Sequence, residues 1–205
     1  WAPLLTDGAA LHFGAGAQYQ EPTERDGGSP WRYSSRPESH MTGLSLVDTG
    51  NIGGNVQELN LLGLEAAGTV GPLTFIGEYL RSDVERARDG NLDFSGWYAQ
   101  AAWMVTGERR GYDADKGVFK GIQPLHPLAS GGSGAWELVA RYSELDLEDG
   151  SISGGEEHNA TLGLGWYASN YVRVSGNWVH VFDIDGGKYD GQSLDALQMR
   201  LQFAY

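Results

Sequence analysis

Hydrophobic and polar residues alternate along most of this chain, and the alternation is strictest at its end. The odd positions there are apolar, namely Leu197, Met199, Leu201, Phe203 and Tyr205. The even positions hold Gln198, Arg200, Gln202 and Ala204. A period of two places successive side chains on opposite faces of a β-strand. The pattern therefore predicts a strand over residues 194–205 with one apolar and one polar face.

The same period recurs through the sequence, interrupted by stretches rich in Gly, Pro, Asn and Asp that favour turns. It predicts about ten strands, at residues 9–20, 31–36, 44–48, 56–67, 73–84, 92–106, 135–147, 158–167, 171–182 and 194–205. In the strand at 56–67 the adjacent Leu61 and Leu62 leave the register open and indicate a bulge. The opening WAPLL is typical of a strand already under way, so we expect a fragment of a longer protein.

The connections between these strands differ in length. If the C-terminus is periplasmic, the short turns at 68–72 and 168–170 fall on the periplasmic side. The polar connections at 21–30, 86–91, 148–155 and 184–193 then fall outside. This asymmetry is typical of transmembrane β-barrels. The 107–134 stretch departs from it, as a long periplasmic segment of the kind that usually has a function or is mobile.

Aromatic residues of the apolar parity fall into two groups by their predicted height. Those near the periplasmic ends are Trp103, Trp136, Trp166, Phe203 and Tyr205, and those near the outer ends are Trp97, Tyr142, Trp178 and Phe182. Two aromatic belts around a band of Leu, Val and Ala are what the two interfaces of a bilayer favour. The core of a soluble β-sandwich gives no reason for such sorting. We therefore predict a single transmembrane β-barrel domain over residues 1–205, with a polar, water-filled interior.

Composition agrees with this prediction and excludes some classes of function. The 31 glycines fit many turns, and the absence of Cys excludes a disulfide framework. A net charge of −13 makes nucleic acid an unsuitable partner. The five His residues are scattered without catalytic or metal-ligand spacing. We expect a protein that is not an enzyme and that needs no metal and no cofactor.

Several stretches carry a resemblance to one known family. They are RPESH (36–40), NLLGLEAAG (60–68), GEYLRSDV (77–84), DFSGWYAQAAWMVTGE (93–108), GAWELVARYSELDL (134–147) and GGEEHNATLGLGWYASNYVR (154–173). In these motifs, in this order, the chain resembles the phosphate-selective porin O/P family. The resemblance implies an outer-membrane porin of a Gram-negative bacterium: a sixteen-stranded barrel assembled as a homotrimer and passing phosphate or related anions. This chain would be its C-terminal part.

The family is known for moving anions along an arginine ladder, so the resemblance also implies site residues. A strand with Arg at i, i+2 and i+4 points its guanidiniums to one side, and each can pass an oxyanion to the next. Here Arg32 and Arg36 take the outer rungs and Ser34 the middle one, which puts strict phosphate selectivity in question. Further candidates for the anion path are Arg141, Arg173, Arg200, Lys116 and Lys120. The last two belong to the 107–134 segment, which would have to fold into the lumen.

Other interpretations stay open at this point. The arginines of the polar face could be salt-bridged to wall carboxylates and serve rigidity alone. The chain could be a complete ten-stranded barrel with a structural or adhesive role, which an intact-mass measurement of the native protein would show. It could also be a soluble, acidic β-sandwich that binds ligands such as carbohydrate. For the barrel, the expected partners are outer-membrane lipid, lipopolysaccharide, two further copies of the chain and small anions such as phosphate.

Overall fold

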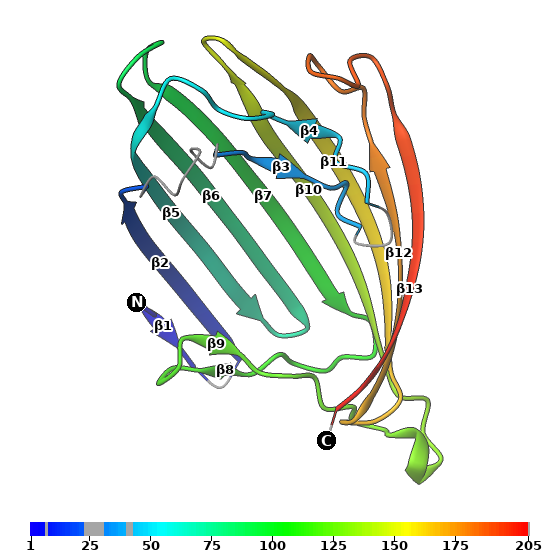
Figure 1. Ribbon diagram of the computed structural model, residues 1–205. Coiled ribbons are helices and arrows are strands. Elements are labelled where there is room, and N and C mark those ends of the chain that lie inside the picture. The colour runs from blue at the N-terminus through cyan, green and yellow to red at the C-terminus, as the bar shows by residue number, and fades with distance from the viewer. Residues whose placement is uncertain (7, 23–30, 40–42, 205) are drawn as a thin grey trace.

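The computed structural model describes residues 1–6, 8–22, 31–39 and 43–204, and the strands among them are antiparallel throughout (Figure 1). One sheet of nine strands has the order β1-β2-β5-β6-β7-β10-β11-β12-β13. Its strands are β1 (Leu4–Leu5), β2 (Ala9–Gln20), β5 (Val56–Val70), β6 (Leu73–Arg86), β7 (Leu92–Met104), β10 (Ala135–Asp149), β11 (Ile152–Tyr167), β12 (Val172–Val181) and β13 (Leu194–Phe203). Each of these strands pairs with the next one in the list. This sheet is called the wall below.

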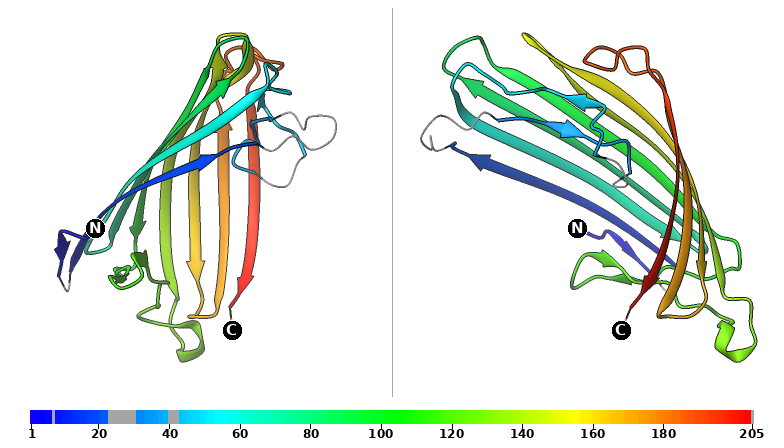
Figure 2. Two further views of the ribbon diagram at one scale, coloured as in Figure 1. Left: turned by 60° about the vertical axis from the view of Figure 1, so that its left-hand side comes forward. Right: turned by 45° about the vertical axis from the view of Figure 1, so that its right-hand side comes forward.

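The wall is strongly curved, with one convex and one concave face (Figure 2). Strands β1 and β13 form its two edges, and no pairing joins them among the residues that the structure describes. The predicted all-β antiparallel fold is therefore confirmed, whereas closure into a barrel stays a prediction. Among the described residues, no helix is long and apolar enough to cross a bilayer.

Alternation along the wall strands sorts side chains between the two faces as predicted. Cross-strand partners share a face, and one such row on the convex side joins Leu64, Tyr79 and Trp97. Apolar side chains on this face are exposed: Leu197 and Met199 of β13 are 85% and 81% accessible. Tyr205 lies outside the described residues. A sheet that exposes its apolar face and turns its polar face inward does not have the arrangement of a soluble sandwich, so that alternative is wrong.

The two aromatic groups also assemble on the convex face. Near one end of the strands the rings of Trp136 and Trp166 lie 6.0 Å apart. Near the other end the ring of Tyr142 lies 5.6 Å from that of Trp97 and 6.3 Å from that of Phe182. The separation by height that the sequence indicates is therefore present in the wall.

The predicted strands at 31–36 and 44–48 are not part of the wall, which has nine strands including the short β1. Only β3 (Ser34–Ser35) and β4 (Val47–Asp48) form there, and they pair with each other alone. They belong to a long connection between β2 and β5, which crosses the concave face (Figures 1 and 2). We call its described part, residues 31–39 and 43–55, the inner loop. Its alternating pattern arises because one side of the loop packs on the wall.

The inner loop is held on the wall by a small apolar core. Val47 and Ile52 of the loop are 0% and 3% exposed, and they share a cluster with Phe94 and other wall residues. The backbone of the loop approaches β11 closely. A Cβ on Gly154 would lie 3.2 Å from Thr49 Cα, and a Cβ on Gly155 would lie 3.3 Å from a methyl of Val47. Glycine in β11 makes this contact possible.

Two local details also differ from the prediction. The polar connection predicted at 148–155 is a tight turn, because β10 continues to Asp149 and β11 begins at Ile152. Loop lengths on that side are therefore less uniform than predicted. The bulge expected at Leu61 and Leu62 lies instead near the start of β5, between Val56 and Glu58. Leu62 is on the convex face and Leu61 on the concave face, because the ladder is regular there.

The 107–134 segment runs along the lower end of the wall in Figure 1 and contains the two-stranded pair β8 (Tyr112–Asp113) and β9 (Val118–Phe119), followed by the short 3-10 helix η1 (Leu128–Ser130). Tyr112 reaches the concave side of β2, where its hydroxyl lies 2.5 Å from His12 Nδ1. Ile122 is buried with Met104 and Tyr167. The segment is therefore attached to the wall at two points, Tyr112 and Ile122.

Candidate functional site: the concave face

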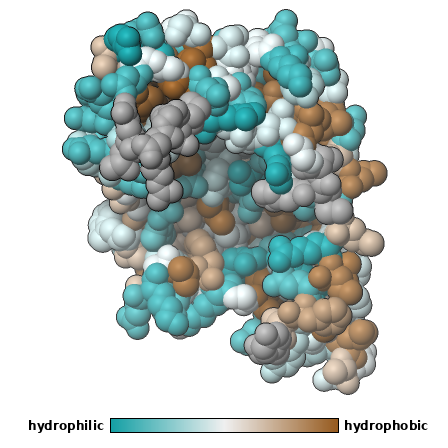
Figure 3. Space-filling model, viewed as in Figure 1, coloured by the Kyte–Doolittle hydropathy of each residue, from teal (hydrophilic) through white to brown (hydrophobic). Residues whose placement is uncertain are grey.

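Two adjoining cavities lie on the concave face, and they share Glu38 and Arg141 in their linings. The upper cavity, of about 680 Å³, lies between the inner loop and the wall. The lower cavity, of about 560 Å³, lies between the wall and the start of the 107–134 segment. Figure 3 shows this side of the molecule hollowed, with hydrophilic residues gathered above and below the hollow.

Alternation in the inner loop places Arg32, Ser34 and Arg36 on the exposed side, while Tyr33 turns to the wall. The Tyr33 hydroxyl lies 2.9 Å from Ser82 Oγ, and its ring lies 5.6 Å from that of Phe94. The predicted i, i+2, i+4 row therefore exists. It is carried by a segment that crosses the concave face, and not by a strand of the wall.

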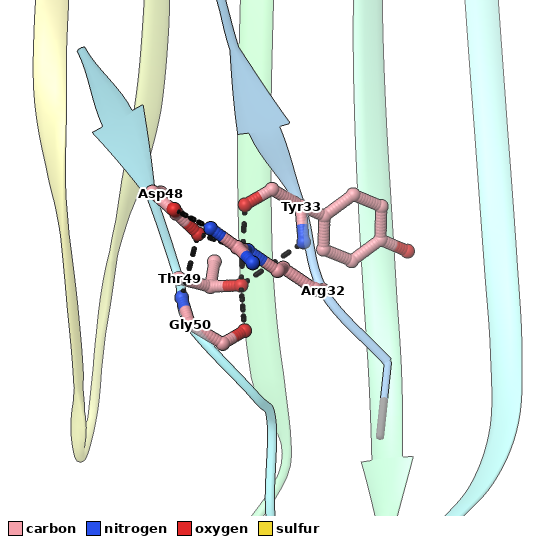
Figure 4. Close-up of polar contacts among 5 residues, drawn as sticks. All are labelled: Arg32, Tyr33, Asp48, Thr49 and Gly50. Carbon is pink, nitrogen blue, oxygen red and sulfur yellow. Dashed lines mark hydrogen bonds and ion pairs between the residues drawn. The ribbon is translucent and has the colours of Figure 1, made fainter. Parts of the chain in front are cut away.

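Arg32 is bound within the inner loop (Figure 4). Its Nε donates to Asp48 Oδ1 at 2.6 Å, and its Nη2 donates to Asp48 Oδ2. A second contact lies beside this ion pair: Tyr33 N donates to Thr49 Oγ1 at 3.0 Å. The hydrogen bond from Arg32 holds the pKa of the Asp48 carboxyl below its ordinary value. Arg32 thus links the segment before β3 to β4 within the inner loop, and its partner is not the wall carboxylate that the salt-bridge interpretation expects.

Arg36 lines the upper cavity, and no described residue accepts a hydrogen bond from its guanidinium. The chain bends directly after it. Pro37 is buried, and Glu38 has a φ of 42°, a left-handed conformation that is uncommon for a residue with a Cβ. This bend carries the Glu38 side chain toward the wall while Arg36 stays exposed.

Glu38 binds the wall at the boundary between the two cavities. Its Oε1 accepts hydrogen bonds from Arg141 Nε at 2.6 Å and from Ser143 Oγ at 2.8 Å. Its Oε2 accepts one from Thr161 Oγ1 at 2.6 Å. The guanidinium of Arg141 also stacks on the ring of Tyr98, with 3.6 Å from Cζ to the ring centroid. Arg141 is therefore fixed in direction by a planar ring and by a carboxylate.

The lower cavity is organised around Glu137, which is 2% exposed. Its Oε1 accepts from Arg110 Nη2 at 2.6 Å. Its Oε2 accepts from the Tyr167 hydroxyl at 2.6 Å and from Arg173 Nη2 at 3.3 Å. Arg173 Nε is buried with no partner among the described residues. One carboxylate thus holds two guanidiniums, which leaves an excess of positive charge.

The charges differ between the cavities. The lower one is lined by three guanidiniums, those of Arg110, Arg141 and Arg173, and by two carboxylates, those of Glu38 and Glu137. The upper one combines Arg36 and Arg141 with a larger acidic set that includes Glu78 and Glu157. The lining of the lower cavity therefore carries more positive than negative side chains, and the lining of the upper cavity carries more negative ones.

The predicted site residues are distributed unevenly. Ser34 and Arg36 line the upper cavity, Arg173 lines the lower cavity, and Arg141 lines both. Lys116, Lys120 and Arg200 line neither cavity, and the charged group of none of the three forms a hydrogen bond or ion pair with a described residue. Arg110 was not predicted. The signal that could have found it is the basic pair Arg109–Arg110, which lies shortly after Met104, the last residue of the wall strand β7.

These features are those of a channel wall: an apolar convex face with aromatic belts, and a polar concave face with a crossing loop and aligned guanidiniums. Comparison with known proteins agrees. The family model described as "Phosphate-selective porin O and P" matches residues 1–205. The chain therefore belongs to the phosphate-selective porin O and P family. This membership places it among outer-membrane porins, which are channel proteins rather than enzymes.

Two curated relatives are similar over most or all of the chain. An uncharacterized protein of Caulobacter vibrioides is 32% identical over 178 residues, which is 87% of this chain and 35% of the relative. Porin O of Pseudomonas aeruginosa is 26% identical over 234 aligned residues, covering 100% of this chain and 51% of the relative. The chain thus spans about a third to a half of the lengths of these relatives.

Proposed function

We propose that the chain forms part of an outer-membrane β-barrel porin whose lumen lies along the concave face and passes small anions, phosphate and related oxyanions among them, by diffusion. The observation that carries this proposal is the lower cavity, where Arg110, Arg141 and Arg173 face two carboxylates. A narrow, water-filled passage with an excess of guanidiniums lowers the free energy of an anion relative to a cation. Membership in the porin family supports the part of the proposal that concerns the class of protein, a porin.

The proposed path passes Arg36 in the upper cavity, then Arg141 at the boundary, then Arg110 and Arg173 below. Guanidinium binds oxyanions through directed hydrogen bonds. Several such sites in series, each partly neutralised by a carboxylate, bind an anion without holding it too tightly for release. Ser34 leaves a gap in the row of the inner loop, which favours a broad anion selectivity over a strict one.

The same proposal covers the surroundings of the chain. Strands outside this sequence would join β1 to β13 and close the barrel. The apolar convex face would contact outer-membrane lipid and lipopolysaccharide, and part of it would contact two further copies in a homotrimer. The 107–134 segment would lie at the periplasmic mouth and fold partly into the lumen, where it contributes Arg110.

Planar-bilayer recordings of the full-length porin test the path with a matched pair of variants. Arg110→Gln removes a guanidinium from the lower cavity. Arg109→Gln makes the same change one residue earlier, at an exposed side chain that lines neither cavity. We expect Arg110→Gln to raise the phosphate concentration that half-blocks chloride current at least about fivefold, as loss of one charge-assisted hydrogen bond would.

Arg109→Gln should change that concentration less than about twofold, because its charge lies in high-dielectric solvent. Equal effects of the two variants, with both proteins folded as judged by heat-modifiable migration in gels, would remove Arg110 from the path.

A further inference from the structure

Glu38 is the one carboxylate that reaches the wall from the inner loop within the described part of the chain, and its surroundings have the chemistry of an anion site. Three side chains of two adjacent strands point hydrogen-bond donors at it: Arg141 and Ser143 of β10, and Thr161 of β11. A guanidinium with two hydroxyls at 2.6–2.8 Å is a donor set suited to any small oxyanion. The carboxylate of Glu38 occupies it.

The backbone of Glu38 is shaped to deliver that carboxylate. A φ of 42° is costly for a non-glycine residue, so neighbouring contacts must stabilise it. Two hydrogen bonds do so: Glu38 N donates to Arg36 O at 2.7 Å, and Gln198 Nε2 of β13 donates to Glu38 O at 3.2 Å. The carboxylate is therefore tethered, and its side chain is 19% exposed.

We propose that Arg141, Ser143 and Thr161 form an oxyanion-binding site of the lumen, and that Glu38 is its built-in competitor. This inference rests on the proposed anion path and adds a regulation of it. A tethered carboxylate has a high effective concentration, so it weakens the binding of a permeating oxyanion at the same donors. The site lies where the two cavities meet, so every anion on the path passes it. Competition there would favour release over retention.

Inorganic phosphate is the probe, and the concentration that half-blocks chloride current through the full-length porin is the readout. Glu38→Gln removes the charged competitor and should lower this concentration at least about fivefold. Glu38→Asp keeps the charge but withdraws the carboxylate by one methylene. This variant should therefore also lower the half-blocking phosphate concentration. Glu78→Gln is the matched control, because it removes one negative charge from the same upper cavity at a residue outside the donor set.

Thr161→Val adds a test of the site itself. In the Glu38→Gln protein it should raise the half-blocking concentration several-fold, because phosphate then loses a donor. In the otherwise unchanged protein its effect should stay below about twofold, because Glu38 holds the donors there. Heat-modifiable migration in gels checks that each variant folds.

The inference is overturned if Glu38→Gln and Glu38→Asp behave like Glu78→Gln, or if Thr161→Val has the same effect in both proteins. In that case a continued effect of Arg110→Gln on phosphate block leaves the proposed anion path in place. If phosphate blocks none of the proteins, the proposed path and the inferred site both fail.

Discussion

Arg32 and Asp48 form a two-pronged ion pair inside the inner loop: Arg32 Nε donates to Asp48 Oδ1 at 2.6 Å while Nη2 binds Oδ2. The pair joins β4 to the segment just before β3, on the concave side of the wall. Arg32 therefore has a structural partner, whereas Arg36, four residues later, has none among the described residues. Two arginines of one predicted row have different surroundings.

This pair makes the inner loop sensitive to acid. The Arg32 hydrogen bond lowers the pKa of Asp48, so the ionised carboxylate is favoured in the folded loop. A lowered pKa gives a stabilisation that is present above the ordinary carboxyl pKa of about 3.9 and is lost as the pH falls through the lowered value. Because the Arg32 side chain is more than half exposed, solvent screens the pair and we expect its contribution to stability to be small.

Asp48→Asn should therefore increase proteolysis of the inner loop at neutral pH, and should remove the further increase that acid causes in the unchanged protein. Limited proteolysis with an acid-tolerant protease from pH 7 to pH 3 measures both effects. Adding Arg32→Gln should cause no further change. An Asp48→Asn protein that is cleaved like the unchanged one at every pH would contradict this role.

Gly154 should be needed for the close packing of the inner loop against β11. A Cβ at this position would lie 2.5 Å from Leu147 O and 3.2 Å from Thr49 Cα, and both are backbone atoms that yield little. We expect Gly154→Ala to cost ~1–3 kcal/mol, as overpacking does. Gly16→Ala is the control, because a Cβ there has nothing within 4 Å. Denaturant titration in detergent should show a change below about 1 kcal/mol for Gly16→Ala.

The two faces of β13 should tolerate charge differently. Leu201 is on the convex face and 58% exposed, and Gln202 pairs with Arg173 on the concave face. Leu201→Arg should cost ~2–4 kcal/mol if the convex face meets the bilayer core. Gln202→Arg should cost less than about 1 kcal/mol, mainly by repulsion from Arg173. Equal losses in a folding titration into lipid vesicles would show that the faces are assigned incorrectly.

Ser34→Arg should complete the row of the inner loop. Ser34 and Arg36 both line the upper cavity, so the added guanidinium would lie beside the proposed path. Phosphate should then bind more tightly and leave more slowly. Single-channel recordings should show block of chloride current at lower phosphate concentration, together with a smaller maximal current. Unchanged block would exclude this part of the loop from the path.

The wall could be predicted from the sequence because its cause is local. Alternation in β2 and β13 reports directly which side chains face out, and the observed bounds of β2 are those predicted. The inner loop could not be predicted in the same way. Trp31 to Arg36 alternates for a different reason, because one side of the loop packs on the wall and the other faces the cavity. A period of two does not distinguish these two environments.

Only the part of the site that depends on strand alternation could be predicted. Parity placed Arg141 and Arg173 on the concave face, but their partners come from distant segments: Glu38 lies 103 residues before Arg141 in the chain. Arg110 has no strand pattern around it, so only the packing of the 107–134 segment brings it to Glu137. Contacts of this kind depend on how the connections fold over the wall.

The zero-current potential of the unmodified full-length porin, in a planar bilayer with a tenfold gradient of potassium chloride, tests the central claim most directly. If the lumen follows the concave face and its guanidiniums dominate, chloride should pass more readily than potassium, and the sign of the potential should show anion selectivity. Phosphate added to either side should then block the chloride current. A potential of cation-selective sign, with no block by phosphate, would contradict the account.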